Sequence, residues 1–247
     1  MTERDLVIEP RKSKKEKALP RRALLVANPA EAEDAYRVFE PYCATKRSLY
    51  QSRIMVDTQH RLCVVGPALG AASAVLILEK LIVLGVKEVY LVSCCGSLDP
   101  SHSIGDVLVG TAGVSGEGVS RYYGGQEVCA PDRGTTEALM AHLRSRGMEP
   151  SSGVLWSTDA PYRERRSAML PLQARYGVTG VDMEFTALCS VALFRGIRLG
   201  ALFVVSDMIW TRRWKPGFGS AAFKTASRGL IERIVDYGLH MEFEESA

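Results

Sequence analysis

The amino-acid sequence predicts a layered α/β domain, and three observations support this prediction. Short apolar runs alternate along the chain with longer segments of helical periodicity, as in sheets that helices cover. The run 199–205 (LGALFVV) contains no alternating polar residues, which is typical of a strand buried on both faces. Residues 185–195 are almost all apolar or small and stop at Gly196, the pattern of a buried helix closed by a glycine.

The first half of the chain contributes strands and one helix. Four short apolar runs are predicted strands: 23–26, 62–65, 89–92 and 107–109. Between the second and the third of these runs, residues 70–84 are mostly apolar and are followed by Gly85. We therefore expect a helix that ends at this glycine.

The second half continues the alternation. Helices are expected at 135–146, 167–176, 185–195 and about 221–243, and strands at 153–157 and 199–205. Gly177 closes the second of these helices, and the last helix is amphipathic. The chain has no internal repeat and no linker rich in proline, glycine or serine. Residues 23–247 are therefore expected to form a single domain that follows an N-terminal arm at 1–22.

The composition agrees with a cytoplasmic enzyme domain. The 247 residues are 47% hydrophobic and 24% charged, which is ordinary for a globular protein. No apolar run approaches the roughly 18 residues of a membrane span, and the N-terminus lacks the apolar stretch of a secretory signal. The six cysteines form no CxxC pair and the four histidines have no metal-ligand spacing. We expect reduced thiols, no metal site and no membrane partner.

The basic N-terminal arm carries the net charge of the chain. Residues 1–22 contain eight basic and four acidic residues, a net charge of +4, while the whole chain has +3. The remainder is therefore close to neutral. The run RKSKKEK at 11–17 is of a kind that attracts phosphates. It has no interleaved aromatic residues, however, so a solvated arm is expected and nucleic-acid binding is not.

Two acidic residues follow predicted strands. Glu184 ends the segment VDME and begins the buried helix, and Asp207 ends the segment VVSD. In open α/β sheets, ligands bind outside the carboxyl ends of the strands, so the two side chains are expected to share a pocket. The alternative is that Glu184 only complements a helix dipole and that Asp207 only caps a turn.

The segments VDME and VSD, at this separation, resemble the nucleoside phosphorylase and nucleosidase superfamily, which includes purine nucleoside phosphorylases, uridine phosphorylases and methylthioadenosine nucleosidases. Five other segments are similar to the family in the same order: 65–73, 92–98, 104–107, 117–123 and 157–162. The resemblance covers roughly residues 23 to 240. It implies a three-layer α/β/α sandwich with a mixed central sheet. It also implies a homo-oligomer, because dimers, trimers and hexamers all occur among such proteins.

The resemblance implies that the chain cleaves the bond between ribose and a nucleobase. Positive charge then builds on the sugar and negative charge on the base, and both need stabilisation. By resemblance, Glu184 accepts hydrogen bonds from the ribose hydroxyls, Met183 packs against the sugar, and the backbone near Asp182 lines the pocket. Asp207 would be the general acid. The base-binding residues would be Cys95, Gly96, Tyr162 and Ser206, although a core position for Tyr162 is equally compatible with the sequence.

Two observations bear on the preferred base, and they favour different bases. Asp207 favours a purine, because a purine has an N7 atom that an acid can protonate and a pyrimidine has none. The segments 117–123 and 158–162 look more like those of uridine phosphorylases. We favour a purine nucleoside, with a uridine-type substrate as the alternative.

The residues expected to bind phosphate depart from the family pattern. Similar phosphorylases have glycine, aspartate, proline, any residue and arginine where this chain has ANPAE, so Ala27 replaces the glycine and Glu31 the arginine. A second family arginine corresponds to Leu91, and the adjacent serine or threonine to Cys94. These changes predict impaired phosphate binding. Other arginines, from this subunit or a neighbour, remain candidates to supply the charge: Arg47, Arg53 and Arg121.

Three functions therefore remain open. The chain is a phosphorylase with a rearranged phosphate site, a nucleosidase that uses water, or a nucleoside-binding protein without turnover. Inorganic phosphate is a possible co-substrate, and no other cofactor is expected. The exact nucleoside and the number of subunits are left undetermined by the sequence.

Overall fold

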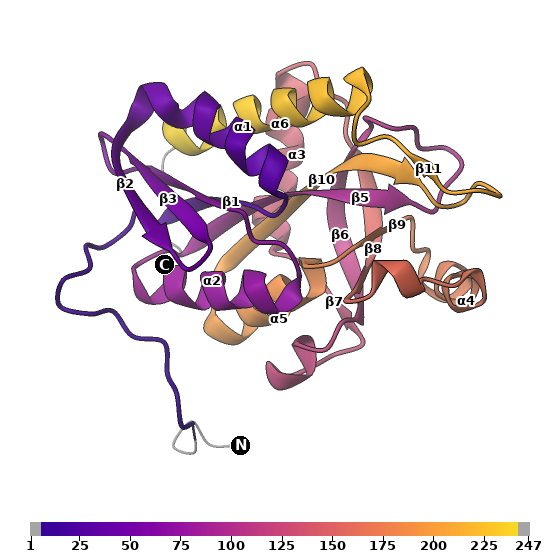
Figure 1. Cartoon of the computed structure of the whole chain (residues 1–247), viewed down its shortest axis with the longest axis horizontal. Helices are drawn as coiled ribbons and strands as arrows, with labels where there is room; N and C mark the ends of the chain where they lie inside the picture. Colours follow the sequence, from indigo (N-terminus) through magenta and orange to yellow (C-terminus); the bar gives the residue numbers. More distant parts are fainter. Residues whose placement is uncertain (1–5, 242–247) are drawn as a thin grey trace.

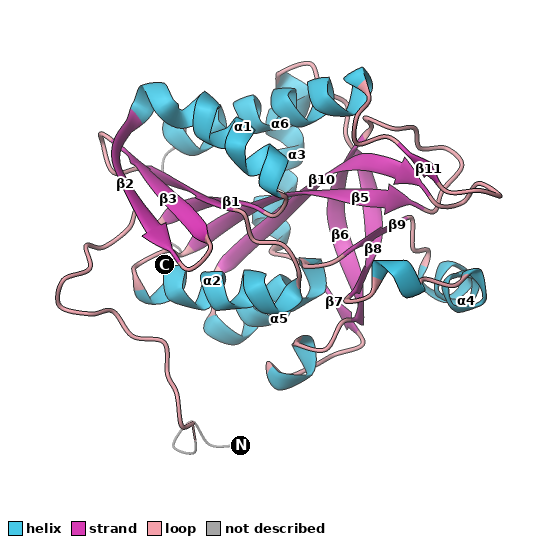
Figure 2. Cartoon of the chain, viewed as in Figure 1, coloured by secondary structure: helices cyan, strands magenta, loops and turns pink. Residues whose placement is uncertain are grey.

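The computed structural model describes residues 6–241, which form helices on both faces of a mixed sheet (Figures 1 and 2). The strands are β1 (Arg22–Val26), β2 (Cys43–Leu49), β3 (Ser52–Asp57), β4 (Leu62–Gly66), β5 (Glu88–Ser97), β6 (Val107–Gly116), β7 (Val128–Cys129), β8 (Ser151–Thr158), β9 (Gly180–Asp182), β10 (Arg198–Met208) and β11 (Lys215–Pro216). The α-helices are α1 (Pro29–Phe39), α2 (Ala71–Val83), α3 (Arg133–Ser145), α4 (Arg166–Tyr176), α5 (Phe185–Arg195) and α6 (Ala221–His240).

The sheet contains parallel and antiparallel pairs in the order β11-β10-β6-β8-β9-β5-β1-β4-β3-β2, with β7 added to β6. Strand β5 also pairs with β10, so that β5, β10, β6, β8 and β9 form a closed circuit of paired strands. β5 is parallel to β1 and β10 and antiparallel to β9. The last residues of β5 therefore lie between β9 and β10, and this is where the site forms.

Helices cover the two faces of the sheet in two groups. Helices α1, α3 and α6 lie on one face, and α2 and α5 lie on the other (Figure 1). Helix α5 is buried from Phe185 through Ala192, as its continuous apolar sequence predicts, because it packs between α2 and the sheet. This arrangement confirms the predicted three-layer α/β/α sandwich with a mixed central sheet.

Several predicted boundaries are confirmed by the structure. Helices α4 and α5 end at Gly177 and Gly196, whose φ angles of 67° and 64° place them in the left-handed region that glycine adopts at little cost. Strand β10 contains the predicted run 199–205 and continues to Met208. Helix α6 ends at His240, and the predicted extension to residue 243 lies partly outside the described residues.

Helix α1 and the β2–β3 hairpin were not predicted. The helix had a usable signal, because its buried residues follow helical spacing: Ala32, Ala35, Tyr36 and Phe39. Strand β2 (CATKRSL) had none, since most of its side chains are exposed at the edge of the sheet and an edge strand needs no apolar run. Strand β2 pairs with β3, and β3 pairs with β4. The position of the hairpin therefore depends on contacts beyond its own segment.

The described part of the N-terminal arm, residues 6–21, forms no helix or strand but contacts the domain. The Leu19 side chain is buried, and its N–H group donates to the carbonyl of Leu84 at 2.8 Å. The Lys80 ammonium lies 2.8 Å from the Glu16 carboxylate. Strand β1 begins at Arg22. The division of the chain into an arm at 1–22 and a single domain at 23–247 stays a prediction.

Within residues 6–241, no helix has the length and apolarity that crossing a bilayer would require. The same part of the chain contains no group of three or more histidine, cysteine or acidic side chains placed to hold a metal ion. All six cysteines are free thiols, of which Cys63, Cys95 and Cys189 are buried.

Candidate active site

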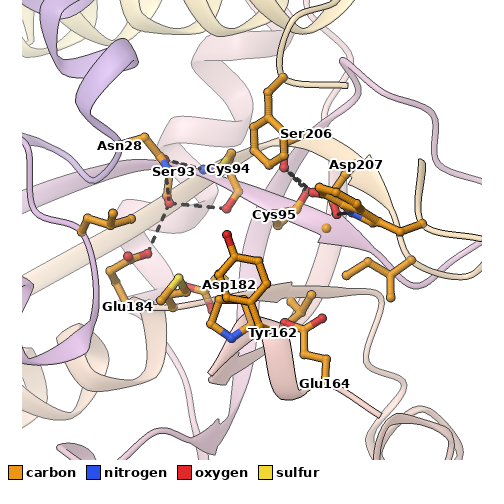
Figure 3. Close-up of a pocket in the computed structure, with 18 of the residues that line it drawn as sticks. Asn28, Ser93, Cys94, Cys95, Tyr162, Glu164, Asp182, Glu184, Ser206 and Asp207 are labelled. Atoms are coloured by element: carbon orange, nitrogen blue, oxygen red, sulfur yellow. Dashed lines mark hydrogen bonds between the residues drawn. The ribbon is translucent and has the colours of Figure 1, made fainter. Parts of the chain in front are cut away.

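A pocket of about 510 Å³ lies where β5, β9 and β10 end, and both predicted acids line it (Figure 3). Glu184 and Asp207 reach it from opposite sides of β5. The Glu184 carboxylate contacts Ser93 of that strand, and Asp207 is paired in the sheet with Gly96. The two acids therefore share one cavity, and their contact points lie three residues apart along β5.

Glu184 is the residue that precedes helix α5, and its side chain is 2% exposed. Its carboxylate forms no cap on its own helix. Instead, Oε1 accepts a hydrogen bond from the Gly70 N–H group at 2.6 Å, and Oε2 accepts one from the Ser93 hydroxyl at 3.4 Å. The interpretation of Glu184 as a mere complement to the helix dipole does not account for these contacts.

Asp182 supplies the cap that Glu184 does not. Its Oδ2 atom accepts hydrogen bonds from the N–H groups of Glu184 and Phe185, at 2.9 and 2.7 Å, and its Oδ1 atom accepts one from the Ser157 hydroxyl at 2.6 Å. A carboxylate in this position satisfies free N–H groups at the start of α5. Asp182 therefore fixes the backbone from which Glu184 extends, and its own carboxylate is occupied.

Replacing Asp182 with alanine is expected to lower both stability and activity. We expect a loss of about 2 kcal/mol or more in unfolding free energy, because N–H groups lose their acceptor in a buried site, and a loss of activity because Glu184 is released. Asp132→Ala is the matched control. Asp132 caps α3 by accepting from Thr135 N–H at 2.8 Å, so this variant should lose about 1 kcal/mol and keep its activity. Urea unfolding and steady-state kinetics test both variants, and full activity in Asp182→Ala would contradict the positioning role.

The two buried acids at the start of α5 resist ionisation. Burial, and then the neighbouring Asp182 carboxyl, raises the pKa of Glu184 to about 8. Burial raises the pKa of Asp182 to about 6. A raised pKa means that the folded protein holds a proton which the unfolded chain releases, so stability falls as the pH increases from the ordinary value towards the raised value.

This titration predicts that the difference in unfolding free energy between the wild type and Glu184→Gln depends on pH. The wild type should lose stability relative to the variant between pH 6.5 and pH 9, by more than about 1 kcal/mol, because only the wild type has to ionise the buried Glu184. Asp182, with its lower pKa, changes little in this window. Urea denaturation at the two pH values measures the effect. Parallel stability profiles for the two proteins would show that the Glu184 side chain is not desolvated in solution.

Asp207 lies at the end of β10 and is 7% exposed. The pairing of β10 with β5 shifts register between Val205 and Asp207. Such a bulge changes the direction of the side chains, and Ser206 and Asp207 both line the pocket although they are adjacent in the strand. The indole N–H group of Trp214 donates to Oδ2 of Asp207 at 2.7 Å, and the Ser206 hydroxyl lies 2.7 Å from Oδ1.

The predicted base-binding residues all line the pocket. Gly96 leaves essential space, since a Cβ atom there would lie 2.4 Å from Ile209 Cδ1 and 3.1 Å from Asp207 Oδ2. Cys95 is buried, and its carbonyl oxygen lies 3.1 Å from the Ser206 hydroxyl. Tyr162 is 98% exposed at the mouth, so a core position for this residue is wrong. Contact of these residues with a base stays a prediction.

Several pocket residues beside Asp207 were not predicted from the sequence. They come from the segment after β8, from the β10–β11 loop and from the segment after β11: Glu164, Arg166, Ile209, Trp214 and Phe218. Burial, and then the neighbouring Asp207 carboxyl, raises the pKa of Glu164 to about 7. The loop sequence WTRRW at 210–214 was a signal, because tryptophans next to arginines in an irregular segment are typical of ligand contacts.

A protein-family model described as the phosphorylase superfamily matches residues 21–235. The chain belongs to this superfamily. The predicted resemblance to nucleoside phosphorylases and nucleosidases is thereby confirmed, and members of the superfamily are enzymes that act on nucleosides.

Two curated relatives are bacterial phosphorylases. The chain is 29% identical over 156 residues to a DeoD-type purine nucleoside phosphorylase of Dichelobacter nodosus, a match that covers 61% of this chain and 65% of the relative. It is 28% identical over 154 residues to the DeoD-type enzyme of Actinobacillus pleuropneumoniae serotype 5b, over 61% of this chain and 64% of that protein. The matches thus span less than two thirds of either relative.

Two solved structures share the fold. Purine nucleoside phosphorylase from Toxoplasma gondii, in complex with immucillin-H, superposes with a TM-score of 0.74 at 21% identity and covers 89% of this chain and 90% of that chain. A futalosine hydrolase mutant of Helicobacter pylori superposes with a TM-score of 0.74 at 14% identity, over 90% of this chain and 100% of that chain. Both similarities support the superfamily's α/β sandwich.

The corner of the pocket next to Glu184, where a phosphorylase of the superfamily would be expected to hold phosphate, contains Asn28, Ser93 and Cys94. The Asn28 side-chain oxygen accepts from the Cys94 N–H group at 3.2 Å and from the Ser93 hydroxyl at 3.4 Å. Burial raises the pKa of Cys94 to about 12, and the nearby carboxyl of Glu31 acts in the same direction. Burial also raises the pKa of Glu31 itself. This corner is therefore polar to acidic.

The other residues of the predicted phosphate site are placed differently. Ala27 and Leu91 are fully buried in the core and do not line the pocket. The three candidate arginines also lie outside its lining. Arg47 donates to the carbonyl of Lys17 at 2.9 Å, the Arg53 guanidinium lies over the Tyr36 ring, and Arg121 lies over Tyr122. A contribution of their charge to the pocket, from this subunit or a neighbouring one, stays a prediction.

Proposed function

We propose that this chain cleaves the N-glycosidic bond of a purine nucleoside and that water accepts the ribose. One observation carries the proposal: Glu184 and Asp207 lie in the same pocket, at contact points three residues apart along β5. This separation is about 10 Å along a strand. The pocket that both acids line has a volume of about 510 Å³, which leaves room for a ribose joined to a nucleobase.

The two acids would stabilise opposite charges. The Glu184 carboxylate accepts hydrogen bonds from the ribose hydroxyls and stabilises the positive charge that develops on the sugar. Asp207 donates a proton to N7, so that the electron pair of the C1′–N9 bond leaves on a neutral base. Trp214 holds the Asp207 carboxyl in place through its N–H group. Water forms the new bond to C1′, and the proton that it loses balances the proton that Asp207 delivers.

The choice of water rests on charge. Of the residues that line the pocket, Arg166 is the basic one, and it lies on the side of Glu164 and Trp214. In the corner next to Glu184, the ionisable groups that act on Cys94 are the carboxyls of Glu31, Glu184 and Asp207. A phosphate dianion there needs cationic or N–H donors, whereas a water molecule needs only polar contacts such as Asn28 and Ser93.

Phosphorolysis is the second candidate, and the similarity to DeoD-type purine nucleoside phosphorylases favours it. In that case inorganic phosphate is a co-substrate and a neighbouring subunit of a homo-oligomer supplies an arginine. The cytoplasmic location and the oligomeric state both stay predictions.

Incubation with purine and pyrimidine nucleosides, with and without phosphate, separates the candidates when free base and sugar are followed by chromatography. We expect free purine and ribose at a rate that does not depend on phosphate. Ribose 1-phosphate that forms only when phosphate is present would establish phosphorolysis instead. Measurable nucleoside affinity without release of base would identify a binding protein and overturn the proposal.

A further inference from the structure

The mouth of the pocket on the Asp207 side is strongly basic. Two segments contribute lining residues there, 161–166 and 209–218. They contain six basic residues, of which Arg166 lines the pocket itself, and one acidic residue, Glu164. All six basic side chains are exposed, and we call them the basic rim: Arg163, Arg165, Arg166, Arg212, Arg213 and Lys215. Residues 23–247, with the rim included, are together close to neutral. The rim is therefore a local concentration of positive charge.

The two segments of the basic rim are joined to each other and to the pocket. The Arg166 guanidinium donates hydrogen bonds to the carbonyl oxygens of Trp210, at 3.3 Å, and of Thr211. Trp214 lines the pocket and also lines a second hollow, which is formed by residues 211–215. Trp214 therefore lies between the pocket and this hollow.

The ribose side of the pocket carries the acid Glu184, whereas the base side carries the acids Asp207 and Glu164 together with the exposed basic rim, which includes Arg166. Glu184 lies at the ribose side and Glu31 acts on Cys94 there, whereas the basic rim lies at the base side. An anionic group on a ligand is repelled at the first and attracted at the second. The exposed aromatic side chains at the mouth, Tyr162, Trp214 and Phe218, offer faces for a planar base and its substituent.

We propose that the substrate is a nucleoside whose base carries a carboxylate-bearing substituent, and that the basic rim binds this carboxylate. The inference rests on the proposed function and narrows it to a substrate class. Burial and Asp207 raise the pKa of Glu164 to about 7, so near neutral pH this acid is partly protonated and repels an anionic substituent less. The arginines of the rim offer the forked donors that carboxylates prefer.

The test compares N6-(carboxymethyl)adenosine with its carboxamide, which has the same size and no charge. At low salt, kcat/KM for the carboxylate should exceed that for the carboxamide by about tenfold or more, and the ratio should fall as sodium chloride is added. In the double variant Arg212→Gln, Arg213→Gln the ratio should approach one. Arg175→Gln, on the exposed end of α4 where it faces Glu127, is the matched control and should keep the wild-type ratio.

The outcomes separate this inference from the proposed function. Cleavage of both compounds at the same kcat/KM by the wild type would overturn the inference and leave the proposed function intact. Failure to release base from either compound or from adenosine would overturn the proposed function, and the ratio of dissociation constants from calorimetry would then test the rim directly. Faster release of base from a short single-stranded oligonucleotide than from the carboxylated nucleoside would overturn the inference in favour of a nucleic-acid substrate.

Discussion

Replacing Asp207 with asparagine is expected to lower the turnover of a purine nucleoside by about 100- to 10,000-fold, while its dissociation constant changes by less than about tenfold. Asparagine has the same shape and its side-chain oxygen can still accept from Trp214, which lies 2.7 Å from the native carboxylate. It has no acidic proton for N7. The loss should therefore fall on the transition state and not on binding.

Steady-state kinetics and calorimetry on the same preparations test the Asp207 prediction. Asp236→Asn is a suitable control, because Asp236 is a partly exposed residue of α6 that pairs with Arg146 at 2.7 Å, and its replacement should change neither quantity. Equal losses of turnover and affinity in Asp207→Asn would mean that Asp207 serves only to bind, and the general-acid role would have to be abandoned.

Glu184→Gln is expected to remove selectivity for ribose. Glutamine keeps the length of the side chain and an oxygen that can accept from Gly70, but it lacks the charge that strengthens hydrogen bonds from the sugar hydroxyls. We expect kcat/KM for a ribonucleoside to fall by about 10- to 100-fold. The 2′-deoxyribonucleoside should lose less, because it has one hydroxyl fewer to contact the carboxylate.

The pH dependence adds a second readout for Glu184. Its pKa is raised to about 8 by burial and by Asp182, and only the ionised form is a full acceptor for the ribose hydroxyls. Binding of a ribonucleoside to the wild type should therefore strengthen as the pH rises towards 8, and this dependence should be absent in Glu184→Gln. An unchanged ratio of ribonucleoside to deoxyribonucleoside activity in the variant would show that the Glu184 carboxylate does not contact the sugar.

The sequence predicted those features of the fold that local patterns determine. The run LGALFVV had to be buried on both faces because it lacks polar alternation, and β10 is buried over this run. The helix ends at Gly177 and Gly196 followed from glycine's access to the left-handed region. Strand β2 was missed, because its polar residues become a strand only through pairing with β3. A long-range contact of this kind leaves no trace in the local sequence.

The two acids of the candidate site could be predicted from the sequence, but the residues that position them could not. Glu184 and Asp207 were recognisable because each lies at or just after the end of a strand. The role of Asp182 as the cap of α5 was not recognisable, since its carboxylate is held by Ser157, which is 25 residues away in the sequence. The bulge that directs Ser206 and Asp207 into one pocket depends on the register of β10 against β5. Trp214 reaches Asp207 through a loop whose path the sequence does not determine.

A crystal structure with a purine nucleoside analogue that cannot be cleaved would test the central claim most directly. We expect the sugar hydroxyls within hydrogen-bonding distance of the Glu184 carboxylate and N7 of the base within hydrogen-bonding distance of Asp207. A sugar bound away from Glu184, or a base whose N7 faces a residue other than Asp207, would contradict the assignment of the two acids to one glycosidic bond.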